Sequence, residues 1–192
     1  TTGWVVADGT ETNAVYVAEN SNLTPKEGNS TFVLIKGVFS PKADYCYNGA
    51  TGAAMGAAIV PGPTQSFWCA ATADGKTVYK KRFFNSLPNG TILGNLSTEL
   101  NEGNTYTQAI EYSKCEAYYA FFLEDALKSD RVSKFTTYCN NYYGVTITSV
   151  SDLGSNTPGG VIKPETPLGA EAWIHGSISI LDWSIVTQSG GI

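Results

Sequence analysis

The stretch EAWIHGSISILDWSIV, residues 171–186, is the longest run of alternating apolar and polar residues in the chain. Ile174, Ile178 and Ile180 share one phase of the alternation, and after Ile180 the apolar residues move to the other phase. Alternation of this kind indicates a half-buried strand, and a one-residue change of phase is what a β-bulge produces. We therefore predict a long C-terminal strand whose two halves serve different sheets.

The same period of two dominates the rest of the sequence. Segments with this alternation are rich in β-branched and aromatic residues; they are residues 3–8, 14–20, 31–39, 66–73, 76–84, 105–112 and 115–123. Turn signals separate several of them, at Asp74-Gly75, at Asn89-Gly90 and at Ser113-Lys114. Short strands joined by such turns predict an all-β fold, an antiparallel β-sandwich of the immunoglobulin-like kind with a terminal strand extension. A β-barrel with one short helix is the alternative.

The pattern changes after residue 123. Val132, Phe135, Cys139 and Tyr142 recur at helical spacing. Asp130 is a possible N-cap and Gly144 a possible C-terminal stop. Residues 136–143 have poor helix propensity, so a short helix and no helix both stay open. Residues 149–170 are rich in Gly, Pro and Ser and predict a long loop. The expected organisation is an N-terminal extension, residues 1–20, and a β-rich globular domain, residues 21–192.

The four cysteines, Cys46, Cys69, Cys115 and Cys139, indicate an oxidising compartment. No two of them form a C-x-x-C pair, so a zinc site is a weak interpretation. Of the three possible pairings we favour Cys46–Cys69 and Cys115–Cys139, which each close a local loop and stabilise by roughly 3 kcal/mol in the chain-entropy model. Four buried free thiols are the alternative.

Composition and sequons also favour an extracellular or cell-surface protein. Charged residues make up only 15% of the chain, and the net charge of -5 argues against nucleic acid as a partner. The apolar run at residues 50–60 is too short to span a membrane. A chain that starts at Thr1 is what signal cleavage leaves. Four asparagines begin N-x-[ST] sequons in turn-like segments, so we expect N-linked glycans on them; they are Asn22, Asn29, Asn89 and Asn95.

Catalytic motifs are missing from the sequence. His175 is the only histidine, and its neighbours Ile174 and Gly176 place it inside the C-terminal strand. The sequence has no G-x-S-x-G elbow, no phosphate-binding loop and no acidic cation-binding loop. We therefore expect no enzyme, no cofactor and no metal. A carbohydrate-active or carbohydrate-binding protein stays open, because paired carboxylates and aromatic residues leave no motif.

The first residues are apolar on both faces of the expected strand: Trp4 and Val6 lie on one, Val5 and Ala7 on the other. A strand buried on both sides has this pattern, and exposed sheet edges accept such strands. With its start at Thr1, its sequons and its charge-poor β body, the chain resembles donor-strand filament subunits, such as archaeal thread-type pilins and bacterial chaperone–usher pilins. The resemblance implies a pilin-like sandwich that polymerises with copies of itself. Residues 1–20 would insert into the next subunit, and the filament would mediate adhesion or cell–cell contact.

A second resemblance is to tick-type salivary lipocalins. Residues 30–46, STFVLIKGVFSPKADYC, and residues 107–122, TQAIEYSKCEAYYAFF, look like early and late barrel strands of that family. This resemblance implies an eight-stranded barrel around a small amphipathic ligand. Gly3-Trp4 departs from the family's G-x-W motif, so no ligand-binding residues are carried over.

Overall fold

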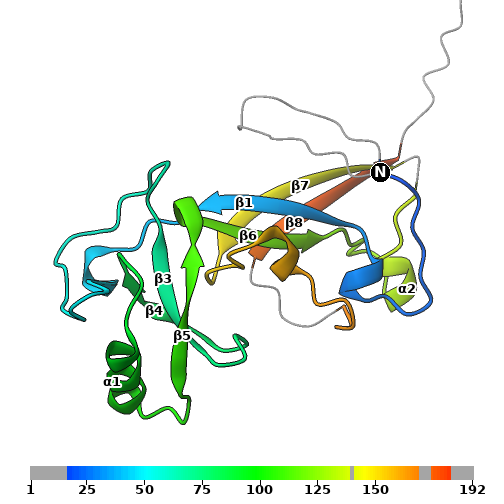
Figure 1. Cartoon of the computed structure of the whole chain (residues 1–192). Helices are drawn as coiled ribbons and strands as arrows, with labels where there is room; N and C mark the ends of the chain where they lie inside the picture. The colour runs from blue at the N-terminus through cyan, green and yellow to red at the C-terminus, as the bar shows by residue number, and fades with distance from the viewer. Residues whose placement is uncertain (1–16, 139–140, 169–173, 183–192) are drawn as a thin grey trace, which may run out of the picture. The chain divides into compact units, whose positions relative to one another are not determined.

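The computed structural model describes residues 17–138, 141–168 and 174–182 (Figure 1). The contacts within the chain divide it into two compact units. The central unit comprises residues 34–120 and 150–162. The terminal unit comprises the described parts of residues 1–33, 121–149 and 163–192. The predicted N-terminal strand falls outside the described residues except for its last part.

A four-stranded sheet forms the base of the central unit, with the order β2–β4–β3–β5. The strands are β2 (Cys46–Tyr47), β3 (Phe67–Thr72), β4 (Val78–Phe84) and β5 (Tyr106–Tyr112). β3 runs antiparallel to both β4 and β5, whereas the short β2 adds parallel to β4. The hairpin predicted at Asp74-Gly75 is confirmed, and its loop is closed by the hydrogen bond from Thr72 N to Thr77 O (3.0 Å).

A second sheet consists of β1 (Phe32–Val38) and β6 (Glu116–Phe122). Two backbone hydrogen bonds flank the pair, from Phe39 N to Cys115 O (2.8 Å) and from Leu123 N to Thr31 O (3.0 Å). Each bond joins the start of one strand to the end of the other, so β1 and β6 are antiparallel.

Aromatic packing joins the end of β1 to the four-stranded sheet. The Phe39 ring lies 5.7 Å from the Phe67 ring and 5.3 Å from the Phe83 ring, centroid to centroid. The predicted all-β class is therefore confirmed, with sandwich-like packing in this unit. The barrel alternative is wrong, because the eight strands of the described residues lie in three separate sheets.

The turn predicted at Ser113-Lys114 is present, but the strands on its two sides do not form a hairpin. The two strands do not pair: β5 joins β3, and β6 joins β1. The chain changes sheets through a short 3-10 turn, Ser113–Cys115 (Figure 1). Lys114 and Cys115 both have positive φ there, 54° and 59°. The pairing partners available to each strand, β3 for β5 and β1 for β6, therefore decide that no hairpin forms here.

The turn predicted at Asn89-Gly90 is wrong, because Asn89 begins helix α1 (Gly90–Leu100). Its side chain accepts a hydrogen bond from Ile92 N (3.0 Å), which is the N-cap interaction. Leu93 and Leu96 are buried against the sheet beside Ala70 and Tyr106. The sequence carried a signal for this helix, since an N-cap residue precedes apolar residues at helical spacing.

The terminal unit contains the strand pair β7 (Asn141–Val150) and β8 (Ile174–Asp182). β8 confirms a strand over residues 174–182 of the predicted C-terminal stretch, whereas the second half of that stretch lies outside the described residues. The possible helix after residue 130 is a single turn, α2 (Arg131–Lys134), with Asp130 as its N-cap. Gly144 is not its end, because it lies in β7; the aromatic and β-branched residues after the turn favour a strand.

Short 3-10 helices complete the described chain: η1 (Glu27–Asn29), η2 (Ala43–Tyr45), η3 (Ser113–Cys115) and η4 (Pro158–Val161). None of the helices in the described ranges has the length and apolar character needed to cross a membrane.

The favoured disulfide Cys46–Cys69 is absent from the structure, where both residues are buried free thiols. Both lie opposite Phe83, one on each side of β4, so two strand spacings of about 4.8 Å separate them. Their Cα atoms are thus about 9.6 Å apart, beyond the roughly 7 Å that a disulfide bridges. Cys115 is also a buried free thiol, so the Cys115–Cys139 bond is not formed either; Cys139 lies outside the described residues.

Thiol labelling tests whether Cys46, Cys69 and Cys115 are free thiols. We expect iodoacetamide to modify Cys46, Cys69 and Cys115 in denaturant without reductant, as read by peptide mass spectrometry. In the native protein at pH 8 these sites should react slowly, because burial raises the pKa of all three thiols and shields the sulfur atoms. Failure of Cys46 and Cys69 to react in denaturant until a reductant is added would show that they are oxidised after all.

Candidate subunit-contact site

Several residues with a predicted role lie outside the described residues, or have side chains that are not described. Trp4, Val5, Val6 and Ala7, the predicted subunit-contact strand, fall outside the described residues. His175 lies in β8, as expected from the alternation, and its side chain is not described.

The four sequon asparagines lie in two places. Asn22 and Asn29 lie close together in the terminal unit, where the Asn22 side chain donates a hydrogen bond to Asn29 O (2.5 Å). Asn89 and Asn95 are exposed on α1, where Asn89 uses its side-chain oxygen in the N-cap. Their use as glycosylation sites stays a prediction.

One edge of β1 has no strand partner among the described residues. The flanking hydrogen bonds with β6 belong to Thr31 and Phe39, so odd-numbered residues of β1 direct their backbone groups toward β6. The N–H and C=O groups of Leu34, Lys36 and Val38 consequently point to the open edge. Val38 is 62% exposed, which is unusual for a valine in a strand. An open edge with an exposed apolar side chain is a template for strand addition.

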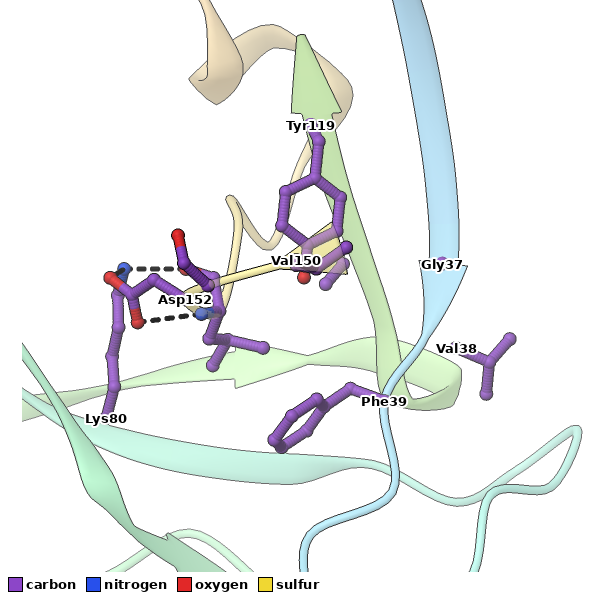
Figure 2. Close-up of a pocket in the computed structure, with 10 residues that line it drawn as sticks. Gly37, Val38, Phe39, Lys80, Tyr119, Val150 and Asp152 are labelled. Atoms are coloured by element: carbon purple, nitrogen blue, oxygen red, sulfur yellow. Dashed lines mark hydrogen bonds and ion pairs between the residues drawn. The ribbon is translucent and has the colours of Figure 1, made fainter. Parts of the chain in front are cut away.

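A pocket of about 420 Å³ opens beside the end of β1 (Figure 2). Its walls are apolar on most sides, with Gly37 from β1, Phe39 directly after that strand, and Ala117 and Tyr119 from β6. Residues 150–153 form a further wall. Tyr119 is only 8% exposed, and burial raises the pKa of its hydroxyl. The pocket can therefore bury an apolar group against two aromatic rings.

The remaining side of the pocket is charged. Lys80 Nζ lies 2.8 Å from Asp152 Oδ2 and donates a second hydrogen bond to Leu153 O (2.6 Å). Figure 2 shows the lysine and the aspartate facing each other across this side. The interactions fix residues 152–153 to β4 and place polar atoms at the edge of an apolar pocket. The arrangement suits a group that is largely apolar with one polar atom.

Residues 150–157, predicted as part of a loop, are built into the central unit. Tyr118 and Ser155 exchange two backbone hydrogen bonds, of 2.8 and 2.9 Å, so this segment adds to the second edge of β6. The Tyr112 hydroxyl donates to Gly154 O (2.9 Å). Composition indicated a loop because the pairing involves only one bridge, too short to produce alternation.

The comparisons with known proteins concern the C-terminal part of the chain. Residues 110–189, somewhat less than half of the chain, match a family model described as the C-terminal part of fimbrillin, the major fimbrial subunit protein type IV. No curated protein matches. Fimbrial subunits are structural proteins of extracellular surface filaments, not enzymes. Over residues 110–189 the chain is therefore similar to subunits of fimbrial surface filaments.

Proposed function

We propose that this protein is an extracellular subunit of a surface filament that polymerises by donor-strand complementation. Residues 1–20 of one copy, with Trp4, Val5, Val6 and Ala7 at the contact, add to the open edge of β1 in the next copy. The filament would mediate adhesion or cell–cell contact. The observation that carries the proposal is the open edge of β1 beside an apolar pocket. The similarity to fimbrial subunits supports the same function.

Strand addition would stabilise both the open edge of β1 and the added N-terminal segment. The backbone groups of Leu34, Lys36 and Val38 would gain hydrogen bonds, each contributing about 0.5–1.5 kcal/mol net. Covering the exposed Val38 side chain adds at most about 1.5–3 kcal/mol. The N-terminal segment has apolar residues on both faces, which an added strand needs if it is covered on both sides.

A proline at the open edge tests the proposal. In Val38→Pro the N–H that is lost points away from β6, so the β1–β6 pair should persist, because sheet edges tolerate proline. We expect the polymers of the wild-type protein, seen by size-exclusion chromatography with light scattering, to be replaced by a monomer near 20.5 kDa. Val38→Ala is the matched control, since it keeps the N–H, and should still polymerise. Wild-type polymerisation by a folded Val38→Pro variant would refute strand addition at this edge.

Two deletions identify the donor. Removal of residues 1–16 should leave a monomer that accepts a synthetic peptide of that segment, whereas removal of residues 183–192 should leave polymerisation intact. Residues 17–20 are kept because Asn20 pairs with Thr137 within its own copy. The opposite result would retain strand addition but assign the donor to the C-terminal segment.

The proposal also includes N-linked glycans on the sequon asparagines. N-linked glycans on Asn89 and Asn95 would extend from the exposed side of α1 and coat the filament. Intact mass measured before and after enzymatic removal of N-glycans from protein isolated from its source tests this. An unchanged mass would remove the glycans from the proposal.

A further inference from the structure

We infer that residues 150–157, the covering segment, block the second edge of β6 and so restrict strand addition on the β1–β6 sheet to the edge of β1. The inference rests on the proposed function and deepens it, because it states what limits each copy to one incoming strand. Its starting point is a contrast between the two edges of this sheet. Among the described residues, β1 has no strand partner on its outer side, whereas the outer side of β6 holds the covering segment.

The covering segment pairs with β6 at one position. Tyr118 N donates to Ser155 O (2.8 Å), and Ser155 N donates to Tyr118 O (2.9 Å). The hydrogen bonds to the β1 side use the odd-numbered Cys115 and Leu123, so even-numbered residues of β6 direct their backbone groups to the second edge. A strand added along this edge would need the backbone groups of Tyr118, which the covering segment already holds.

Most of the interactions that hold the covering segment come from the four-stranded sheet. Lys80 Nζ, from β4, lies 2.8 Å from Asp152 Oδ2 and also donates to Leu153 O (2.6 Å). Figure 2 shows the Lys80 side chain reaching to Asp152. The Leu153 side chain is only 4% exposed, so this part of the segment is fixed by apolar packing as well as by the lysine.

Strand β5 holds the rest of the covering segment. The Tyr112 hydroxyl donates to Gly154 O (2.9 Å), and Asn156 Nδ2 donates to Glu111 O (3.0 Å). These two hydrogen bonds lie on either side of Ser155 in the sequence. The residue that pairs with β6 is therefore held in place from both directions by contacts that do not involve β6.

The consequence for assembly is that one sheet edge is open and the other is closed. An exposed edge is a template for uncontrolled pairing, and a loop that covers the edge is one way in which folded proteins prevent this. A subunit that donates one strand and accepts one strand assembles linearly. With the second edge of β6 also open, each copy would have two acceptor edges, and assembly would branch.

The test removes the side chains that anchor the covering segment. The anchor-loss variant combines Lys80→Met, Tyr112→Phe and Asn156→Ala, which delete the hydrogen bonds but keep the lysine stem and the stacked tyrosine ring. We expect hydrogen exchange at the Tyr118 amide, measured by NMR, to accelerate about tenfold or more, with exchange at the amides that join β3 to β4 unchanged. Lys76→Met is the matched control, because it removes an ion pair of the β3–β4 hairpin instead.

Assembly is measured in the Val38→Pro background, in which the edge of β1 is blocked. By size-exclusion chromatography with light scattering, Val38→Pro alone should have a mass near 20.5 kDa. With the anchor-loss substitutions added, we expect species of about twice that mass or more, because two uncovered edges can pair with each other. The Lys76→Met control in the same background should stay monomeric.

A disulfide lock distinguishes opening of the edge from misfolding. Tyr118 and Ser155 exchange both backbone hydrogen bonds, a pairing with Cα atoms about 5.5 Å apart, which a disulfide can span. Oxidised Tyr118→Cys with Ser155→Cys should return the anchor-loss chain to a monomer, and a reductant should restore association.

A monomeric anchor-loss chain with fast exchange at Tyr118 would overturn the inference, because the uncovered edge would then attract no strand. Unchanged exchange at Tyr118 would overturn it too, since the covering segment would not depend on these anchors. The proposed function is judged separately, by Val38→Pro alone. If that variant polymerises, strand addition at β1 fails, whereas the inference about β6 stands if anchor loss adds association that the oxidised lock removes.

Discussion

Replacing Gly154 with alanine should lower the free energy of unfolding of the central unit by about 2–4 kcal/mol. A Cβ atom at this position would lie 2.2 Å from the backbone oxygen of Tyr118 and 2.8 Å from the Tyr119 ring. The oxygen belongs to a paired strand and cannot rotate away as a side chain does. Chemical denaturation followed by tryptophan fluorescence and far-ultraviolet circular dichroism measures the loss.

The reason for so large an effect is that several interactions depend on this close approach. Gly154 O accepts the hydrogen bond of the buried Tyr112 hydroxyl, whose pKa is raised by burial. The next residue, Ser155, makes both hydrogen bonds to Tyr118, and the preceding Leu153 forms a wall of the pocket. Displacing the segment therefore exposes polar groups and also distorts the pocket.

The control for this substitution is Gly94→Ala. Gly94 is exposed in α1, and a Cβ there meets nothing within 4 Å, so alanine should stabilise by about 0.5–1 kcal/mol through helix propensity. A Gly154→Ala variant with the stability of the wild type would show that the strand-like segment at residues 150–157 does not approach β6 as described.

Truncation of Phe67 to alanine should cost about 3–5 kcal/mol. Phe67 is fully buried, and its ring stacks on Tyr112 with a centroid distance of 4.8 Å and an interplanar angle of 8°. It also meets Phe83 edge-on at 5.4 Å and Phe39 at 5.7 Å. Alanine would leave a cavity where the β1–β6 sheet meets the four-stranded sheet.

Two further variants serve as comparisons for the stability loss in Phe67→Ala. Phe67→Leu keeps most of the volume and should lose clearly less stability, whereas Leu127→Ala should be near neutral because Leu127 is 94% exposed. Since Phe39 both contacts Phe67 and lines the pocket, Phe67→Ala should also weaken assembly at temperatures where the chain stays folded. Equal losses in Phe67→Ala and Phe67→Leu would argue against a packed aromatic core at this point.

The local sequence pattern correctly predicted most of the strands. Residues 31–39, 66–73, 76–84, 105–112 and 115–123 each contain a strand of the structure, because alternating residues with β-branched and aromatic side chains favour a half-buried strand in any context. Asp130 was recognised as an N-cap for a similar reason, since the interaction spans only three residues.

The local sequence pattern did not predict features that depend on residues distant in the sequence. Asn89-Gly90 suits a turn or a helix start, and the buried face beside Ala70 and Tyr106 selects the helix. The gap of 23 residues suggested a Cys46–Cys69 bond, yet β4 lies between these two residues. Likewise, nothing local reveals that β5 and β6 separate into different sheets.

The sequence by itself therefore determined the all-β class, the positions of most strands and the charge-poor composition, because each depends on side chains within a few residues of one another. Only the tertiary structure decided which strands pair, that the three described thiols are free, and that one edge of β1 has no strand partner within the described part of the chain. Pairing and pocket geometry arise from contacts between residues far apart in the chain, whose burial and hydrogen bonds are satisfied collectively. The sequence pattern does not show with which of several possible partners a strand pairs.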